Sequence, residues 1–488
     1  MSAAEGLVQL IARQANASPH GVYLEDARSD RTIGYAALAD AASAWAAELT
    51  ARDIAPGGSV IVDIADPLDF ALVHLSIVAA GRRSVPTNPD LTGAELRRIS
   101  ELLGGADLLV TDGQGRDEVG VPIVPAVTPS AGRPRAASDG HTGSGSVLLF
   151  TSGSTGTPKG VELDERQLLF VARGIAEHNR LVPEDRGYNP LPLFHVNAEV
   201  VGLLATLVAG ATLVLDRRFH RTGFWELLTE RRITWLNAVP AMLAVLARGG
   251  EFAVPGSLRF VRSASAPLPN AVRASLGDVP LVVSYGMTEG ASQITATPLD
   301  SEPRDGSVGV PVGSEVQARD ETGRVLPAGE VGAFWIRGAG IVTRYFGDRA
   351  SDRFDADGWL STGDLGYLDA DGYVYLVGRS DDVINRGGEK VYPAEVEEVL
   401  LGDERVREAV VVGKPDPILH QVPVAFVIPT AELSADDALA LVGALFERAE
   451  RELPRFKRPM DITVVDDVPR APTGKVQRSR VRERVEQE

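Results

Sequence analysis

The stretch Leu148–Gly160, LLFTSGSTGTPKG, decides the fold of this chain. Its apolar start reads as the end of a strand, and six hydroxyl or glycine residues follow at positions 151–156. Glycines let backbone N–H groups converge on an anion, hydroxyls add donors, and Lys159 adds positive charge. This chemistry suits a polyphosphate, and the alternative is a flexible surface loop. It is not a Walker A loop, because Pro158 precedes the lysine and Gly160 follows it.

Outward from this loop, short apolar strands alternate with helical patterns, which predicts βαβ units and mostly parallel sheets. The predicted strands are Ser59–Ile64, a strand ending at Val85, Leu108–Thr111, Val147–Phe150, Thr212–Leu215 and Leu281–Val283, with a helix at Pro67–Ala80. Residues 128–146 are rich in Gly, Ser, Pro and Ala and read as an exposed connection.

The pattern of residue types changes from about residue 305 onward. Segments such as GAFWIRG and DADGYVYLVGR predict antiparallel hairpins. An α+β pattern then follows, with helices at Pro393–Leu401 and Ala435–Glu452 and strands at Ala409–Gly413, Val424–Ile428 and Ile462–Val465. We therefore predict an α/β fold: a large N-terminal domain (1–380) of mostly parallel sheets with flanking helices plus a small β-barrel-like part, and a small mobile α+β C-terminal domain (381–488).

The amino-acid composition argues against several classes of function. The 488 residues carry 49 Lys and Arg against 67 Asp and Glu, a net charge of −18, which argues against nucleic-acid binding and against an anionic membrane surface. The absence of cysteine excludes disulfides, thiolate metal sites and cysteine nucleophiles. Residues 1–20 lack the pattern of a signal peptide and read as an amphipathic helix, and the apolar stretch Val200–Leu215 is too short to span a membrane. We expect a cytoplasmic protein, monomeric or homodimeric.

The loop at 148–160 resembles the phosphate loop of the adenylate-forming (ANL) superfamily of acyl-CoA synthetases, peptide-synthetase adenylation domains and luciferases. Five further motifs follow in the family's order. They are Tyr285-Gly286-Met287-Thr288-Glu289 (YGxTE), Ser361-Thr362-Gly363-Asp364 (TGD), Gly378–Ile384 (GRxDDxI), Arg386–Glu395 (GGExxxPxE) and Pro469–Lys475 (PRxxxGK). Six motifs in register identify the chain as a member of this superfamily.

The resemblance implies ATP, Mg²⁺ and coenzyme A as cofactors. The implied nucleotide-binding residues are Thr151, Ser152, Gly153, Ser154, Thr155, Gly156 and Lys159 for phosphate, Ser265, Ala266, Pro267, Tyr285, Gly286 and Met287 for adenine, and Asp364 and Arg379 for ribose. Thr288 and Glu289 pair a hydroxyl with a carboxylate, which suits Mg²⁺ and a phosphate oxygen. Glu289 and Thr155 are the predicted metal ligands. The alternative for Thr288 and Glu289 is a solvated helix N-terminus.

The C-terminal motifs imply a mobile catalytic domain. Lys475 would neutralise charge on the α-phosphate as the carboxylate attacks and pyrophosphate leaves. Asp381 matches the family's hinge position, about which the small domain rotates between the two half-reactions. Gly387, Gly388 and Glu389 match the element that lines the pantetheine tunnel and binds coenzyme A.

The acid-binding pocket is the part that the sequence defines least. His195 follows Phe194 at the expected pocket mouth and is a candidate catalytic residue, with a packed structural histidine as the alternative. Phe194, Asn197, Trp235 and Gly309 are the predicted pocket residues. No Arg or Lys stands out among them, which favours a small to medium monocarboxylate, aliphatic or aromatic.

Three other features depart from the family pattern. Glu199 is expected to face water or a partner, or to contact a polar or cationic substrate. Arg82 and Arg83 reach coenzyme A phosphates or lie at the surface, the latter being favoured. Asn385-Arg386 resembles the small-acid branch, such as oxalate–CoA ligases.

Three functional hypotheses follow. The first is an acid–CoA ligase that forms an acyl-adenylate and pyrophosphate, then a thioester and AMP. The second keeps adenylation but passes the acyl group to a carrier-protein thiol or an amine, or activates an unusual small oxyacid without coenzyme A. The third is an inactive homologue that acts as a binding module. The presence of Lys159, Glu289, Asp364, Arg379 and Lys475 argues against the third.

Overall fold

A computed structural model describes residues 5–487 except 115, 129–143, 152–158, 248–253, 267, 269, 302–303, 348–351 and 471–475. The chain divides into two compact units. Unit 1 contains Met1–Glu315 and Ile336–Leu360, and unit 2 contains Val316–Trp335 and Ser361–Glu488. This division assigns two segments before residue 381 to unit 2, so the predicted boundary at 380/381 and the movement of 381–488 as one body stay predictions.

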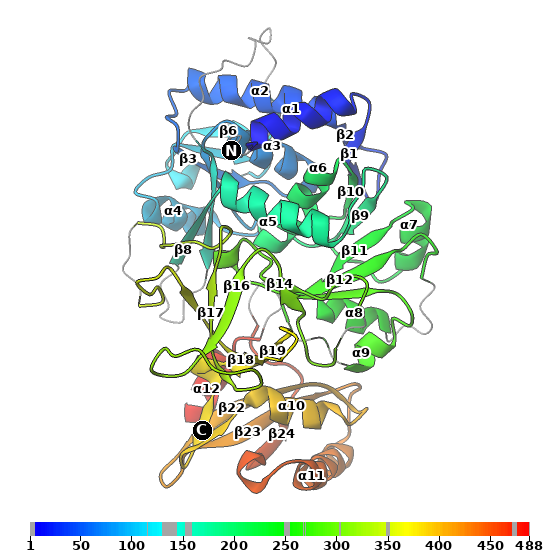
Figure 1. Cartoon of the computed structure of the whole chain (residues 1–488), viewed down its shortest axis with the longest axis vertical. Helices are drawn as coiled ribbons and strands as arrows, with labels where there is room; N and C mark the ends of the chain where they lie inside the picture. The colour runs from blue at the N-terminus through cyan, green and yellow to red at the C-terminus, as the bar shows by residue number, and fades with distance from the viewer. Residues whose placement is uncertain are drawn as a thin grey trace. The chain divides into compact units, whose positions relative to one another are not determined.

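Two sheets build unit 1 (Figure 1). The nine-stranded sheet has the order β15 (Val310–Pro311), β14 (Thr295–Ala296), β13 (Leu281–Tyr285), β12 (Phe260–Ala264), β11 (Trp235–Ala238), β9 (Arg186–Asn189), β10 (Thr212–Leu215), β1 (Val22–Asp26), β2 (Thr32–Gly34). The six-stranded sheet has the order β6 (Ile123–Pro125), β5 (Leu108–Thr111), β3 (Ser59–Asp63), β4 (Arg83–Pro86), β7 (Ser146–Thr151), β8 (Lys159–Asp164). The inner strands pair in parallel, as predicted, and antiparallel strands β2, β8, β14 and β15 lie toward the edges.

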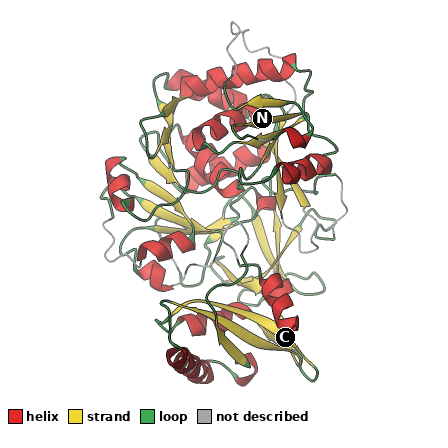
Figure 2. Ribbon diagram, turned by 180° about the vertical axis from the view of Figure 1, so that it is seen from behind, coloured by secondary structure: helices red, strands yellow, loops and turns green. Residues whose placement is uncertain are grey.

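Helices accompany these sheets, as the alternating pattern predicts (Figure 2). They are α1 (Leu7–Ala17), α2 (Tyr35–Ala51), α3 (Pro67–Ala79), α4 (Gly93–Leu102), α5 (Glu165–His178), α6 (Ala205–Ala209), α7 (Phe224–Glu230), α8 (Pro240–Ala247) and α9 (Asn270–Ala274). Helix α3 shows why the sequence forms a helix here. Asp66 accepts hydrogen bonds from the backbone N–H groups of Leu68 and Asp69, and Pro67 occupies the first turn, where its missing N–H costs nothing.

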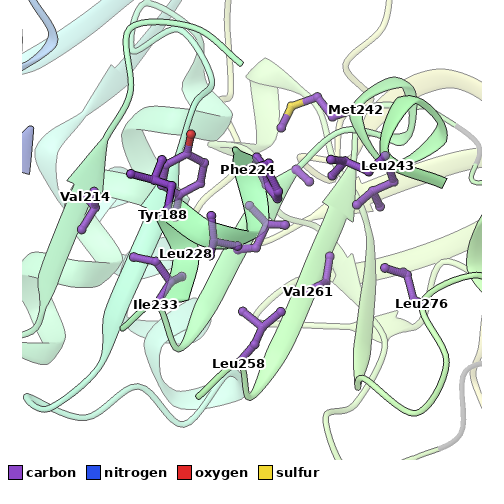
Figure 3. Close-up of a cluster of buried hydrophobic side chains, with 14 of the residues drawn as sticks. Tyr188, Val214, Phe224, Leu228, Ile233, Met242, Leu243, Leu258, Val261 and Leu276 are labelled. Atoms are coloured by element: carbon purple, nitrogen blue, oxygen red, sulfur yellow. The ribbon is translucent and has the colours of Figure 1, made fainter. Parts of the chain in front are cut away.

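A hydrophobic core fixes the nine-stranded sheet (Figure 3). Side chains from β9, β10, β12 and the helices α7 and α8 meet there, among them Tyr188, Val214, Phe224, Leu243 and Val261. Tyr188 and Phe224 pack edge to face with ring centroids 5.7 Å apart. Burying each such side chain contributes about 1.5–3 kcal/mol to the stability of the fold. This core therefore holds the carboxyl ends of the strands in fixed positions.

Unit 2 contains a four-stranded and a five-stranded sheet. The first has the order β16 (Glu315–Arg319), β17 (Gly332–Arg337), β18 (Leu360–Leu368), β19 (Val374–Arg379), and corresponds to the predicted barrel-like part. The second has the order β21 (Glu389–Val391), β20 (Ile384–Arg386), β23 (His420–Pro429), β22 (Val406–Asp416), with β24 (Asp461–Val464) beside β23. Helices α10 (Pro393–Leu401), α11 (Ala435–Glu452) and α12 (Arg478–Gln487) complete the unit. Leu441, Leu445 and Ala449 recur at four-residue spacing and form the buried stripe of α11.

The predicted elements are largely confirmed. Helices α10 and α11 have the predicted bounds, and β18 and β19 form the predicted antiparallel hairpin. Val200–Leu215 forms the end of a π-helix (η2, Asn197–Leu204), then α6 and β10. Most of the predicted connection at 128–146 lies outside the described residues. Within the part of the chain that the structure describes, no helix is both long and apolar enough to cross a membrane.

Gly309 illustrates how closely the backbone packs beside β14. It has φ +85°, and a Cβ atom there would lie 1.9 Å from the carbonyl carbon of Ala296. We expect Gly309→Ala to lower the free energy of unfolding by more than about 3 kcal/mol, because both backbone strain and overlap oppose it. Gly57→Ala is the matched control: Gly57 has φ +77° but open space around it, so about 1 kcal/mol is expected. Equal shifts of the urea midpoints would contradict this account.

Candidate active site

The carboxyl ends of three neighbouring strands carry the predicted site residues of unit 1. Strands β11, β12 and β13 pair in parallel, so their ends meet at one sheet edge. Asn237 lies near the end of β11, Ser265 follows β12, and Tyr285 ends β13 immediately before Gly286–Glu289. Ligands of open α/β sheets bind at this edge, and the structure therefore brings together residues that are up to 52 positions apart in sequence, from Asn237 to Glu289.

Glu289 forms the centre of a charged cluster. Its Oε1 atom accepts a hydrogen bond from the Tyr345 hydroxyl (2.9 Å) and from Arg353 Nη1 (2.9 Å). Lys159 Nζ lies 5.3 Å from the centroid of the Tyr345 ring. Burial, together with the Glu289 carboxylate, raises the pKa of Tyr345, so its hydroxyl stays a neutral donor. Tyr345 and Arg353 were not predicted as site residues, because no short-range pattern in the sequence links them to Glu289.

The Glu289 cluster fits a nucleotide-bound Mg²⁺. Magnesium in such sites takes one or two carboxylates plus phosphate oxygens, and not a full cage of protein ligands. Among the described residues no group of three or more His, Asp or Glu side chains could hold a metal by itself. Glu289 is 6% exposed, and both hydrogen bonds named above fall on one of its two oxygens. The cluster thus offers one carboxylate, which fits a metal ion whose remaining ligands come from phosphate and water.

The backbone is closely packed or strained at several of the adenine-binding candidates and their neighbours. Gly286 accepts no side chain, since a Cβ atom there would lie 1.3 Å from the carbonyl oxygen of Ser292. Ser265 and Ser292 have φ +78° and +88°, which non-glycine residues rarely adopt, and such strain concentrates at functional sites. Tyr285 is buried, Ser265 and Ala266 are exposed, and Met287 is half-buried.

The acid-pocket candidates lie at the start of the π-helix η2. Phe194 and His195 have ring centroids 4.5 Å apart, and burial lowers the pKa of His195, which keeps its imidazole neutral at pH 7. Asn197 opens η2 and donates to Ser265 Oγ (3.5 Å). Its Oδ1 accepts from Asn237 Nδ2 (3.0 Å). Asn197 therefore joins the His195 segment to the adenine-binding segment, and π-helical turns are common at functional sites.

Arg262 is a further charged residue beside these candidates, and it was not predicted from the sequence. It lies on β12, is 1% exposed, and its Nη1 is 3.4 Å from Asn197 Oδ1 and 3.2 Å from Asn237 Oδ1. The predicted pocket positions contain no basic residue, but the structure places the guanidinium of Arg262 beside one of them, Asn197. Three small residues, Ser263 to Ser265, separate it from Ala266-Pro267 of the predicted adenine-binding segment. An arginine within this short, otherwise uncharged strand was the available signal.

Trp235 is a core residue. Its ring is fully buried, stacks on Phe260 at a centroid distance of 6.0 Å, and leaves no room for a Cβ atom at Gly187. The prediction that it lines the substrate pocket is corrected accordingly, and Asn237, two residues further along β11, reaches Asn197 instead.

The structure also corrects three secondary expectations. Glu199 faces neither water nor substrate: it is 1% exposed, and its Oε1 lies 3.0 Å from Nε2 of buried His74. Arg82 is not at the surface, because it is buried and donates to the backbone oxygens of Ile54 and Ala80. Arg83 is half-buried and donates to Glu162 Oε1 (2.7 Å). All three stabilise the fold.

Unit 2 carries the ribose and coenzyme A candidates. Asp364 and Arg379 lie opposite each other on β18 and β19, and Arg379 Nη1 donates to Asp364 Oδ1 (2.9 Å). Gly387 and Gly388 have φ +62° and +95° and close the two-residue turn between β20 and β21, which presents Glu389 at the surface.

The predicted hinge residue Asp381 is exposed in the short helix η4 (Ser380–Asp382). Arg482 of α12 donates to the Asp381 carbonyl (3.2 Å) and to Asp382 Oδ1 (3.1 Å). Ser152, Gly153, Ser154, Thr155, Gly156, Pro267 and Lys475 lie outside the described residues, as does the side chain of Thr151. For these residues the assigned roles stay predictions.

Comparison with known proteins agrees with this geometry. The family model described as AMP-binding enzyme matches residues 11–346, and the model described as AMP-binding enzyme C-terminal domain matches residues 395–475. The chain is 36% identical to a sulfoacetate–CoA ligase of Cupriavidus necator, over 97% of this chain and 96% of that protein. It is 31% identical to an oxalate–CoA ligase of Arabidopsis thaliana, over 87% and 88%.

Solved structures match over nearly the whole chain. ATP-bound MatB from Rhodopseudomonas palustris has a TM-score of 0.87 at 27% identity and covers 98% of this chain and 99% of its own. The o-succinylbenzoate coenzyme A synthetase of Bacillus subtilis, with ATP and magnesium, has a TM-score of 0.84 at 28% identity, with coverages of 96% and 98%. The same enzyme with its acyl-adenylate intermediate matches equally well, with a TM-score of 0.84. The chain therefore belongs to the AMP-binding enzyme family and is an adenylate-forming enzyme of the acid–CoA ligase type.

Proposed function

We propose that this enzyme activates a small, polar carboxylic acid with ATP and transfers the acyl group to coenzyme A. In the first half-reaction a carboxylate oxygen attacks the α-phosphorus of ATP, and the bond to pyrophosphate breaks. In the second, the coenzyme A thiol attacks the acyl carbon, loses its proton, and AMP leaves. AMP is needed because a carboxylate oxygen alone is a poor leaving group.

The Glu289 cluster supports the first half-reaction. Mg²⁺, when bound by Glu289 and phosphate oxygens, neutralises negative charge on the triphosphate. Arg353 and Tyr345 hold the Glu289 carboxylate in one orientation through two hydrogen bonds of 2.9 Å. Lys159, and Lys475 from unit 2, supply positive charge to the phosphates in this proposal. His195, neutral at pH 7, orients the reacting carboxylate.

A cluster of hydrogen-bonded polar side chains is the observation that carries the proposal of a small acid. At the strand ends, Asn237 donates a hydrogen bond to Asn197 (3.0 Å), and Asn197 donates one to Ser265 (3.5 Å). A long alkyl chain could make no hydrogen bond to this cluster, whereas a small acid with polar substituents could. The relatives named above as sulfoacetate and oxalate ligases act on small acids with polar substituents, which agrees with this interpretation.

The exposed turn at Gly387 and Gly388 supports coenzyme A as acceptor, as the names of the relatives do. A carrier-protein thiol and an amine are the alternative acceptors. Coenzyme A, a carrier protein and an amine differ enough in size and chemistry that an experiment can separate them.

The test measures initial rates of pyrophosphate release with Mg-ATP across acids of two to sixteen carbons, with coenzyme A, a phosphopantetheinylated carrier protein or hydroxylamine as acceptor. We expect acids of a few carbons with polar substituents to give acyl-CoA, identified by mass spectrometry. A preference for long-chain acids, or release that depends on carrier protein alone, would contradict the proposal.

A further inference from the structure

Arg262 is a buried cation without a counter-ion. Its side chain is among the largest that are fully buried, and its residue exposure is 1%. No carboxylate forms an ion pair with it within the described part of the chain. Its nearest partners are neutral: Asn197 and Asn237 on one guanidinium nitrogen, and Ser284 (3.0 Å) and Gln293 (3.4 Å) on the other.

Leaving a guanidinium in this state is costly. An ion removed from water costs several kcal/mol unless an opposite charge lies nearby. Burial lowers the pKa of Arg262 to about 9, so the side chain still carries its charge at pH 7. The Arg262 Nε atom and the Gln293 Nε2 atom are both buried and have no hydrogen-bond partner. Arg262 and Gln293 therefore present two buried donors without partners. The positive charge of Arg262 is also not balanced by any of the described side chains.

The position of Arg262 connects it to the reaction site. Asn197, 3.4 Å from the guanidinium, lies two residues after His195 and donates to Ser265 of the adenine-binding segment. Ser284, 3.0 Å from the other nitrogen, directly precedes the Tyr285–Glu289 motif. The charge thus lies among the segments that converge on the acid, and not in a remote part of the core.

A structural role alone accounts poorly for this choice of residue. Elsewhere in unit 1, Arg186 and Arg231 both bind the Glu25 carboxylate. Buried Arg82 also lacks a carboxylate, but its Nε, Nη1 and Nη2 atoms all donate to the backbone oxygens of Ile54 and Ala80, whereas the Nε atom of Arg262 has no partner. Arg262 instead has amide and hydroxyl partners at 3.0–3.4 Å, which are longer than charge-assisted hydrogen bonds. This is the arrangement of a cation that awaits an anionic ligand.

We infer that Arg262 is the specificity residue for a second anionic group on the acid substrate, a carboxylate or a sulfonate that does not react. The substrate class is then a short acid with two acidic groups, of which one is adenylated and the other pairs with Arg262, with Asn197 and Gln293 as flanking donors. This inference deepens the proposed function and rests on it.

The test uses matched pairs of acids that differ only in the second charge: malonate with malonamate, succinate with succinamate, and sulfoacetate with methylsulfonylacetate. The wild-type enzyme should form the CoA thioester of one or more charged members at least about 100-fold more efficiently, in kcat/KM, than that of the neutral partner, because the neutral partner leaves the buried guanidinium without an opposite charge. A wild-type ratio near one for all pairs would overturn the inference without any variant being made.

Variants separate recognition of the second charge from other roles. In Arg262→Gln the ratio of the two kcat/KM values should fall toward one, chiefly through KM of the charged member, and Arg262→Lys should keep part of it. Arg259→Gln is the matched control: Arg259 precedes the same strand, is partly exposed and pairs with Asp185, so the ratio should not change. Equal losses on both members of a pair would assign Arg262 to the reacting carboxylate or to folding, and would overturn the inference.

Two further measurements distinguish failure of the Arg262 inference from failure of the proposed function. ATP affinity by calorimetry shows whether Arg262→Gln still folds its nucleotide site. Thioester formation from simple monocarboxylates with no activity on any two-charge acid would overturn the inference and leave the proposed function intact. Pyrophosphate release without any thioester, from every acid, would refute both.

Discussion

Lys475→Ala should bind ATP normally and lose at least about 100-fold in the rate of pyrophosphate release. The expected loss follows from the role proposed for Lys475, because a cation aimed at charge that develops in the transition state contributes about 3–4 kcal/mol to catalysis and little to ground-state binding. Calorimetry for ATP and a pyrophosphate assay measure the two quantities. Lys414→Ala, on β22 of the same unit, is the control and should keep both.

A second measurement locates the effect of Lys475 within the reaction. When the acyl-adenylate is supplied, the Lys475→Ala enzyme should form the thioester at a rate close to that of the wild type, since the phosphate bond has already been broken. An unchanged rate of pyrophosphate release, or an equal loss in both half-reactions, would show that Lys475 does not have the assigned role.

Glu289→Gln should lower the rate of adenylation about 100-fold and raise the Mg²⁺ concentration needed for half-maximal rate. The amide keeps the shape of the side chain but removes the charge that pairs with Arg353, and it is a poor ligand for Mg²⁺. Pyrophosphate release as a function of Mg²⁺ concentration measures both effects. Glu315→Gln removes an equally charged but exposed partner of Arg337 and should leave the Mg²⁺ dependence unchanged. The same Mg²⁺ curve for Glu289→Gln and wild type would remove Glu289 from the metal site.

Those parts of the molecule with a local signal could be predicted from the sequence. The bounds of α10 and α11 follow from their own residues: Pro393 opens one, and Ser434 caps the other by accepting from the backbone N–H of Asp437. The parallel sheets of unit 1 follow from the alternation of short strands and helices. The motifs at 285–289 and 361–364 carry their chemistry in a few adjacent residues, so the family could be identified without a structure.

Contacts between distant residues could not be predicted in this way. Arg262 lies 65 positions from Asn197, and Arg353 lies 64 positions from Glu289, so no spacing rule connects them. Arg82 and Glu199 look like surface residues by type, yet the fold buries them against backbone oxygens and His74. Such contacts depend on the fold, which is why the sequence did not indicate the buried arginine beside Asn197.

The most direct test of the central claim follows one oxygen atom. The acid identified in the pyrophosphate assay is prepared with ¹⁸O in its reacting carboxylate and incubated with Mg-ATP and coenzyme A, and the AMP is analysed by mass spectrometry. Attack of the carboxylate on the α-phosphorus followed by thiolysis predicts AMP that carries one ¹⁸O atom, with none in the pyrophosphate. Unlabelled AMP, or label in pyrophosphate or inorganic phosphate, would contradict the acyl-adenylate pathway.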